Sequence, residues 1–298
     1  MKNTIFTGSG VAIVTPFNED NTINFDKFEE LIEFQIKSGT DAIIVCGTTG
    51  ESAALSHEEH SSVIEFATKK IAGRVPVIAG TGSNDTRYCL KLCKEAESHK
   101  VDAFLMVTPY YNKTSQDGLF EHYKYISDNT NTPMIIYNVP GRTGLNVKPE
   151  TYYRLSKLEN VVAIKEANGD IAALAKTISL CEDNLDYYSG NDDQIVPFLS
   201  LGAKGVISVM ANVIPKQTHK IVSDYLCGDT ESARKAQLKY TKLINTLFMD
   251  VNPIVVKSIL NYAGVNVGHL RLPLIVPSKE QKEIILKVME EYNLTEIL

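Results

Sequence analysis

The sequence lacks basic tracts and long apolar runs. Its 298 residues include 30 Lys and Arg against 36 Asp and Glu, a net charge of −6, and no run of Lys or Arg exceeds a pair. Nucleic-acid-binding surfaces need clustered positive charge, so a nucleic-acid partner is not expected. No segment approaches the roughly 18 apolar residues of a membrane span, and the patch from Val11 to Val14 is too short for a signal-peptide core. We therefore expect a cytoplasmic protein without membrane partners.

Paired cysteine motifs are also missing. The five cysteines are odd in number and show no Cys-x-x-Cys spacing, which predicts reduced and mostly buried thiols. Cys89 and Cys93 have the spacing to share a helix face, but no further ligand cluster lies near them in the sequence. We expect no metal site.

A dinucleotide-binding fingerprint is absent as well. Residues 80–85 read Gly-Thr-Gly-Ser-Asn-Asp, so they begin like Gly-x-Gly-x-x-Gly but end in Asp85. The pair Gly8 and Gly10 precedes an expected strand instead of following it. These departures disfavour a doubly wound Rossmann sheet, the main structural alternative, and we expect no cofactor.

Short apolar strands alternate with amphipathic helical stretches along most of the chain. The strands are near-continuous apolar runs, as is typical of parallel strands covered on both faces. Eight such units in succession predict a (β/α)8 TIM barrel, which needs about 250 residues. The expected strands are Gly10–Val14, Ala42–Cys46, Pro76–Ala79, Ala103–Thr108, Met134–Asn138, Val161–Lys165, Asp186–Ser189 and Gly205–Val209.

Helix start signals and a strand-free tail complete this interpretation. Asn24 precedes an apolar pattern at helical spacing, and Ser56 with Glu59 three residues later forms a capping-box sequence. From about Pro215 onward the apolar residues repeat only at helical spacing. We expect a barrel domain over residues 1–225 and a small helical C-terminal region over residues 226–298.

The most informative segment is Val161-Val-Ala-Ile-Lys-Glu166, because it places Lys165 at the end of an expected buried strand. Burial disfavours the ammonium form and can leave a free amine that attacks a carbonyl at neutral pH, as Schiff-base chemistry requires. The alternative is that Lys165 reaches solvent or pairs with a carboxylate such as Glu166.

Residues at the carboxyl ends of barrel strands converge on one face. The ends expected here supply one amine, several hydroxyls, an arginine and small residues, without the two acids of a glycosidase. Thr48 and Thr49 lie between glycines and suit a small carboxylate, or they form a simple polar turn. Arg142 suits bidentate carboxylate recognition, or it is a solvated loop charge. Tyr137 is either part of this site or an ordinary core aromatic residue.

Six motifs resemble those of the dihydrodipicolinate synthase family, within the pyruvate-dependent class I aldolase and N-acetylneuraminate lyase superfamily. The resemblance covers the chain from about residue 4 to its end. The motifs are Gly47-Thr-Thr-Gly-Glu-Ser52, Val107-Thr-Pro-Tyr-Tyr-Asn112, Tyr137-Asn-Val-Pro-Gly-Arg-Thr-Gly144, Ile164-Lys-Glu-Ala167, Ser189-Gly-Asn-Asp192 and Gly205-Val-Ile-Ser-Val209.

The resemblance implies catalytic roles for four residues. Lys165 matches the lysine that forms an imine with pyruvate. Thr48, Tyr137 and Tyr111 match the hydroxyls of a proton relay. In that family the tyrosine matched by Tyr111 is lent across a dimer interface, which implies a homo-oligomer, and we expect a tetramer built from dimers.

The resemblance also implies four substrate-binding residues and a reaction. Thr49 matches the residue that holds the pyruvate carboxylate, and Arg142 matches the one that binds the carboxylate of L-aspartate 4-semialdehyde. Gly190 and Ile207 match positions that line the pocket near the imine. The implied enzyme condenses the two substrates to 4-hydroxy-tetrahydrodipicolinate, in lysine and diaminopimelate biosynthesis.

Two alternatives remain open. A sister aldolase, such as N-acetylneuraminate lyase or a 2-keto-3-deoxy sugar acid aldolase, would share the barrel, the lysine and the tyrosine. Arg142 favours a short aldehyde that carries a carboxylate over a neutral polyol. A barrel that binds keto acids without turning them over is disfavoured, because all the reactive groups are present.

A second, regulatory site is implied for lysine. The residues that match it are Ser52, Ala53, His57, His60, Asn84 and Tyr110. Without the resemblance, the two histidines read as a solvated helix start or as ligands. Tyr88 stands where lysine-sensitive members carry a glutamate that grips the lysine amine. We therefore expect weak or absent inhibition by lysine.

Overall fold

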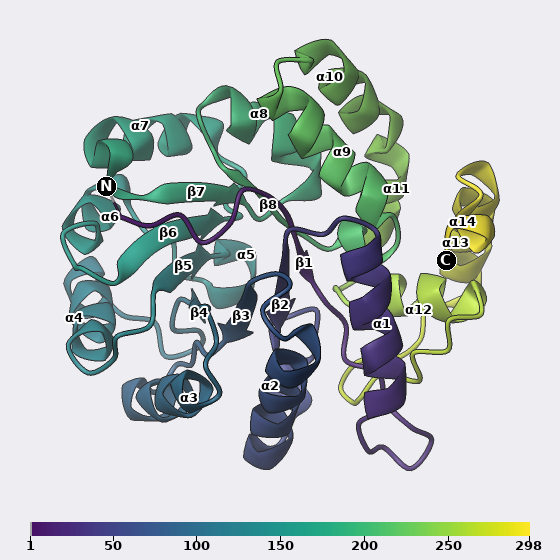
Figure 1. Cartoon of the computed structure of the whole chain (residues 1–298), viewed down its shortest axis with the longest axis horizontal. Helices are drawn as coiled ribbons and strands as arrows, with labels where there is room; N and C mark the ends of the chain where they lie inside the picture. The colour runs from purple at the N-terminus through teal and green to yellow at the C-terminus, as the bar shows by residue number, and fades with distance from the viewer. Residues whose placement is uncertain (1) are drawn as a thin grey trace.

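Eight parallel strands close into a barrel in the computed structural model, which describes residues 2–298. Figure 1 shows the helices surrounding this barrel. Each strand pairs with the next in sequence, and β1 pairs with β8. The strands are β1 Gly8–Ala12, β2 Ala42–Val45, β3 Val77–Gly80, β4 Ala103–Val107, β5 Met134–Asn138, β6 Val161–Glu166, β7 Asp186–Ser189 and β8 Gly205–Ser208. The predicted (β/α)8 barrel is confirmed.

The first strand differs most from its sequence-based prediction, because it begins at Gly8 instead of Gly10. Gly8 pairs with Gly205 where β1 meets β8, and a Cβ on Gly205 would lie 1.8 Å from the Gly8 carbonyl oxygen. Backbones that approach this closely require glycine. An apolar pattern cannot reveal a strand start built from glycine and serine.

The two helices with predicted capping signals begin where those signals lie. The Asn24 side chain accepts a hydrogen bond from Lys27 N at the start of α1, and Ser56 with Glu59 forms the capping box of α2. Helices of the barrel layer are α1 Phe25–Lys37, α2 His57–Ile71, α3 Thr86–Ser98, α4 Gln116–Ser127, α5 Pro140–Thr143, α6 Pro149–Leu155, α7 Ile171–Cys181, α8 Ile195–Ser200 and α9 Pro215–Leu226. Single 3-10 turns are η1 Ser52–Ala54, η2 Glu182–Asn184, η3 Asp192–Gln194 and η4 Met210–Asn212.

Five further helices form the C-terminal region; in Figure 1, α10 lies at the top, and α12, α13 and α14 lie at the right, beyond α1. They are α10 Thr230–Lys239, α11 Thr241–Leu247, α12 Ile254–Tyr262, α13 Lys279–Glu291 and α14 Leu294–Ile297. The predicted boundary at residue 225 falls one residue before the end of α9. Because α10 packs along α9, this boundary stays a prediction.

The amino end of the barrel is filled by apolar side chains. Phe6 stacks on Tyr188 with ring centroids 4.3 Å apart, and the Tyr188 hydroxyl donates a hydrogen bond of 2.6 Å to the Phe6 carbonyl. Ile44, Ile135 and Ile207 belong to the same buried cluster. This packing leaves the carboxyl ends of the strands as the place for a site.

The described residues contain no helix that is both long and apolar enough to cross a membrane.

Candidate active site

A cavity of about 180 Å³ opens among the carboxyl ends of the strands. Residues from β1, β4, β5 and β6, from the loops that follow several strands, and from the C-terminal region line it. They are Ala12, Gly47, Thr48, Thr49, Leu105, Tyr137, Val139, Arg142, Lys165, Ala167, Gly190, Asn191, Val209, Phe248 and Asn252. Six of the eight predicted catalytic and substrate-binding residues are therefore brought together.

Lys165 lies on β6, in register with Tyr137 on β5 and with Tyr188 on β7, and only 5% of its surface is exposed. Its Nζ lies 4.2 Å from the centroid of the Tyr137 ring. Burial lowers the pKa of Lys165 to about 7; Asp192 raises it in part, and Arg142 lowers it further. A large fraction of this amine is therefore uncharged at neutral pH, as a nucleophile must be.

The adjacent Glu166 does not neutralise Lys165, because side chains alternate in direction along a strand. Glu166 accepts hydrogen bonds from Asn138 Nδ2 at 2.9 Å and from the Tyr152 hydroxyl at 2.9 Å. Burial raises the pKa of Glu166 to about 7, against the lowering effect of these bonds. Asn138 Oδ1 also accepts from Val147 N, so this network holds the loop that carries Arg142 to the ends of β5 and β6.

Gly190 leaves the space that the Lys165 side chain occupies. A Cβ at this position would lie 2.8 Å from the Ala167 Cβ and 3.2 Å from the Lys165 Cε. Any larger residue would push against the amine's own methylene chain. Gly190 thus leaves room for the Lys165 side chain because it has no Cβ.

Tyr137 and Thr48 present hydroxyls to the cavity that contains Lys165. Burial raises the pKa of Tyr137 to about 12, while Arg142 and Thr48 act in the opposite direction. The phenol is therefore protonated at neutral pH and is able to pass a proton on. The ring beneath the Lys165 amine is also placed to contact an adduct formed there.

Thr49 and Arg142 are both linked to Asn252, a residue of the C-terminal region. Asn252 Nδ2 donates a hydrogen bond of 2.9 Å to Thr49 Oγ1, and Arg142 Nη2 donates one of 3.1 Å to the Asn252 carbonyl. Sequence reasoning missed Asn252 and its neighbour in the cavity, Phe248. Neither follows a strand, so the rule that located the other residues could not find them.

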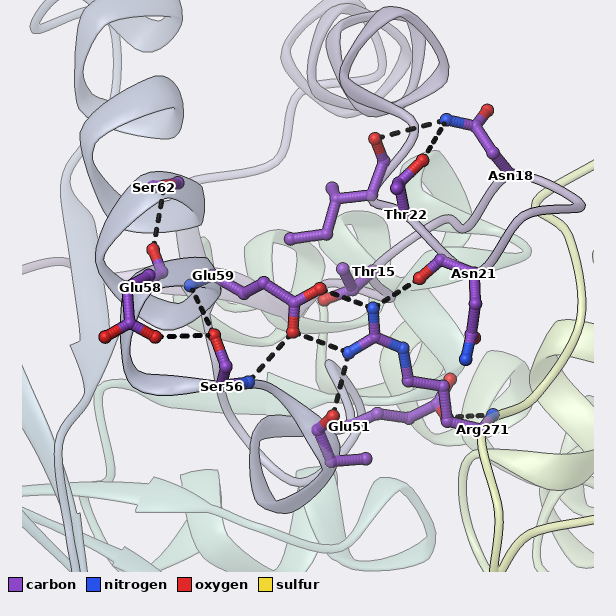
Figure 2. A network of polar contacts seen from close by, with 12 residues as sticks. Thr15, Asn18, Asn21, Thr22, Glu51, Ser56, Glu58, Glu59, Ser62 and Arg271 are labelled. Atoms are coloured by element: carbon purple, nitrogen blue, oxygen red, sulfur yellow. Dashed lines mark hydrogen bonds and ion pairs between the residues drawn. The ribbon is translucent and has the colours of Figure 1, made fainter.

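The loop that carries Thr48 and Thr49 is held from its far side by buried charges. Two residues after Thr49, the Glu51 carboxylate accepts from Lys257 Nζ at 2.7 Å and from Arg271 N at 2.9 Å. The Arg271 guanidinium forms an ion pair with both Glu59 oxygens at the start of α2, as Figure 2 shows. The C-terminal region thereby fixes the position of this loop.

Two predicted residues do not line the cavity. Ile207 is fully buried in the apolar cluster at the amino side of the site. Tyr111 lies in the loop after β4 with 92% of its surface exposed and a positive φ of 68°. Within the described part of this single chain, its hydroxyl does not belong to the cavity.

No group of three or more His, Cys, Asp or Glu side chains that could hold a metal ion occurs in residues 2–298. Cys89 and Cys93 do share a face of α3, where both thiols donate hydrogen bonds to Thr81. This arrangement is ordinary packing between α3 and the end of β3.

Comparison with known proteins assigns the family. The model of the dihydrodipicolinate synthetase family matches residues 5–292. The chain belongs to this family. The 4-hydroxy-tetrahydrodipicolinate synthase of Acetivibrio thermocellus is 53% identical to it, over 99% of the chain and 100% of that protein.

Two solved structures of the dihydrodipicolinate synthetase family share the complete fold. The dihydrodipicolinate synthase of Thermotoga maritima has a TM-score of 0.95 and 43% identity, covering 98% of this chain and 100% of that one. The enzyme of Acinetobacter baumannii, described as chloride inhibited and complexed with pyruvate, has a TM-score of 0.95 and 39% identity. That likeness covers 99% of this chain and 100% of that one.

The residues that match the family's lysine site lie in the segments that follow β2, β3 and β4 and at the start of α2. Ser52 and Ala53 form part of η1, and Asn112 Nδ2 next to the exposed tyrosines donates a hydrogen bond of 2.9 Å to the Asn84 carbonyl. Tyr110 is 38% exposed and Tyr88 39% exposed. The loops are thus tied together at the surface.

The two histidines of this group are already partnered within residues 2–298. His57 Nε2 lies 3.0 Å from Glu95 Oε2, two turns along α3 from Tyr88. His60 is 6% exposed, and its Nε2 forms a hydrogen bond of 2.8 Å with the Gly80 carbonyl. Burial lowers the pKa of His60, so it is a neutral, structural histidine.

Proposed function

We propose that this protein condenses pyruvate with L-aspartate 4-semialdehyde to give 4-hydroxy-tetrahydrodipicolinate, a step of lysine and diaminopimelate biosynthesis. The observation that carries this proposal is the buried Lys165 amine, with its pKa near 7 and the Tyr137 ring 4.2 Å away. The names and the near-complete coverage of the relatives support the same reaction.

The chemistry begins with the attack of the uncharged Lys165 amine on the ketone carbon of pyruvate. Loss of one water molecule forms a protonated imine, which acidifies the methyl protons. Tyr137 and Thr48 carry the protons of this step, and removal of a methyl proton gives an enamine. The enamine carbon then attacks the aldehyde of the second substrate.

Closing the ring of the product also releases it from Lys165. The amino group of the semialdehyde attacks the imine carbon, displaces the Lys165 amine and closes the ring, so one water molecule is formed in the whole cycle. Thr49 binds the carboxylate of pyruvate, and the Arg142 guanidinium binds that of the semialdehyde. Gly190 provides space at the imine, and Ile207 supports the floor of the site.

Borohydride trapping tests the first step. The protein is incubated with pyruvate and reduced, and its mass is measured. We expect one covalent pyruvyl group per chain, located on Lys165 by peptide mapping, and no adduct in Lys165→Ala. Unmodified protein at saturating pyruvate would overturn the proposal and leave a keto-acid-binding protein.

Acceptor assays test the second step. Aspartate semialdehyde, N-acetylmannosamine and glyceraldehyde are offered in turn to the pyruvate-loaded protein. We expect turnover with the semialdehyde alone, and Arg142→Gln should raise its KM. Turnover of a polyol aldehyde would assign the chain to a sister aldolase instead.

We also propose that Tyr111 completes the proton relay of a second protomer in a tetramer built from dimers. The 92% exposure of its side chain supports a position where a partner can receive it. Mixing Lys165→Ala with Tyr111→Phe protein tests this. Mixed dimers should regain activity, since one site then holds both residues. No recovery, together with full activity of Tyr111→Phe, would remove Tyr111 from the relay.

Weak or absent lysine inhibition is a further part of the proposal. Tyr88 supplies no carboxylate for a lysine amine, and the nearby Glu95 carboxylate lies 3.0 Å from His57 Nε2. Steady-state rates should change little with lysine, whereas Tyr88→Glu should increase the sensitivity. Full inhibition of the unmodified protein at submillimolar lysine would contradict this. A cytoplasmic location suits the free thiols of all five cysteines.

A further inference from the structure

Asn252 joins the two groups assigned to the two substrate carboxylates. It lies between α11 and α12, outside the barrel strands, yet it lines the cavity and is 6% exposed. Its side-chain amide donates to Thr49 Oγ1, and its main-chain carbonyl accepts from Arg142 Nη2. A single residue of the C-terminal region therefore contacts both positions.

The direction of the bond to Thr49 matters, because a hydroxyl has one hydrogen to donate. Asn252 Nδ2 donates to the Thr49 oxygen, so the Thr49 hydrogen is left for another acceptor. No protein acceptor for it is found among residues 2–298, and Thr49 itself is buried against the cavity. The geometry leaves the cavity as the place where the acceptor must be.

The direction rests on the contact of Asn252 Nδ2 with Thr49, because the opposite end of the amide has no partner among residues 2–298. Asn252 Oδ1 is buried and has no hydrogen-bond partner in the described residues. Were the amide reversed, Oδ1 would accept the Thr49 hydrogen and remove it from the substrate. A donor at this position thus turns the Thr49 hydroxyl into a donor toward a carboxylate.

We propose that Asn252 is a positioning residue for pyruvate: it directs the Thr49 hydroxyl hydrogen toward the pyruvate carboxylate. The inference rests on the proposed function and adds to it a residue outside the barrel. Asn252 acts through Thr49 and takes no part in the covalent steps at Lys165.

Two substitutions separate this role from a structural one. Asn252→Asp replaces the donor with an acceptor, which captures the Thr49 hydrogen and adds negative charge beside the substrate. We expect its KM for pyruvate to rise about 100-fold. Asn252→Ala only removes the donor, and we expect a rise of about tenfold, the effect of one hydrogen bond. In both variants kcat and the KM for the semialdehyde should change less.

A double-mutant cycle tests whether Asn252 acts through Thr49. Thr49→Val alone should raise the KM for pyruvate, and adding Asn252→Ala should cause little further rise. Asn245→Asp is the matched control, because Asn245 is an exposed amide on the neighbouring α11. It should leave the KM for pyruvate unchanged.

Four outcomes decide the matter once melting temperatures show that each variant is folded. Equal pyruvate KM values in the unmodified protein and both Asn252 variants would overturn the inference, as would full additivity with Thr49→Val. A larger effect of Ala than of Asp would overturn the direction of the bond. Failure of the unmodified protein to form a borohydride-trapped adduct would instead count against the proposed function.

Discussion

Two lysines of this chain are both buried and both lie over an aromatic ring, but their chemistry differs. Lys165 is 5% exposed and lies 4.2 Å from the Tyr137 ring, while Lys257 is 1% exposed and lies 4.4 Å from the Phe17 ring. Burial is the first cause of a lowered pKa in both. The difference lies in their polar partners.

Lys257 donates to the Glu51 carboxylate at 2.7 Å and to the carbonyls of Thr15 and His269 at 3.1 and 2.6 Å. These acceptors favour the ammonium form. For Lys165, the groups that shift the pKa besides burial act only through space, with no hydrogen-bonded acceptor among residues 2–298. Burial alone thus does not make a lysine nucleophilic. A buried amine stays uncharged and reactive when no hydrogen-bond acceptor stabilises its ammonium form.

Removing Lys165 should have the largest effect on activity. Lys165→Ala deletes the nucleophile, and we expect a loss of at least about 10³-fold in kcat with no pyruvate adduct. The melting temperature should not fall, because an unpaired buried amine contributes little to stability. Borohydride trapping and thermal unfolding of the same preparation measure both effects. A pyruvate adduct on another lysine of this variant would contradict the conclusion that Lys165, unlike Lys257, is the nucleophile.

Removing Lys257 should mainly reduce stability. Lys257→Met leaves the Glu51 carboxylate buried without its cation, and we expect a loss of about 3–5 kcal/mol in the free energy of unfolding. Denaturant titration measures it. The double variant Lys257→Met with Glu51→Gln should recover part of this loss, because no bare charge remains.

The adduct should still form on Lys165 in these Lys257 variants. If Lys257→Met abolished trapping while it remained folded, the ion pair would belong to the catalytic apparatus as well.

The sequence predicted the barrel well because most strands carry their own apolar run and helices such as α1 and α2 carry their own N-terminal caps. Met134–Asn138 and Asp186–Ser189 have the bounds that the pattern predicted. Strand ends then located Thr48, Tyr137, Arg142 and Lys165 by one geometric rule.

Sequence reasoning placed Lys165 at the end of an expected strand and Lys257 in the expected helical tail, but it could not predict that only Lys257 meets a carboxylate. Lys257 ends the run Ile254-Val-Val-Lys257 just as Lys165 ends Val161-Val-Ala-Ile-Lys165. One lies on a helix and meets Glu51 from 206 residues away, and the other lies on a strand that ends at the cavity. Pairing across such distances, like the contact of Asn252 with Thr49, depends on the assembled fold.

Substituting Tyr137 tests a further difference between the two lysines. Both lie over an aromatic ring, but only the ring beside Lys165 carries a hydroxyl. Tyr137→Phe keeps the ring beside Lys165 and removes the proton carrier, so we expect a loss of about 10²-fold in kcat. Phe17→Tyr adds a hydroxyl near Lys257 and should not alter the rate. The two variants are compared by steady-state assay. An unchanged rate in Tyr137→Phe would leave Thr48 as the proton carrier.

The smallest effect is a shift of a pH profile. With a pKa near 7, the Lys165 amine gains a proton as the pH falls through 7, so the rate of adduct formation should drop about tenfold per unit at lower pH. Above pH 8 the rate should level off. Arg142 lowers the pKa of Lys165, so Arg142→Gln should move the midpoint upward, and Asp192→Asn should move it downward because Asp192 raises that pKa.

The pKa of Tyr137 is about 12 and lies outside this range, but that of Glu166 is also about 7 and must be separated from the titration of Lys165. Glu166→Gln keeps an acceptor for Asn138 and removes the titrating group. Its profile should keep the midpoint near 7, measured as the rate of trapping at saturating pyruvate. A midpoint near 10 in the unmodified protein would mean that Lys165 is as well solvated as a surface lysine, and the distinction from Lys257 would then rest on position alone.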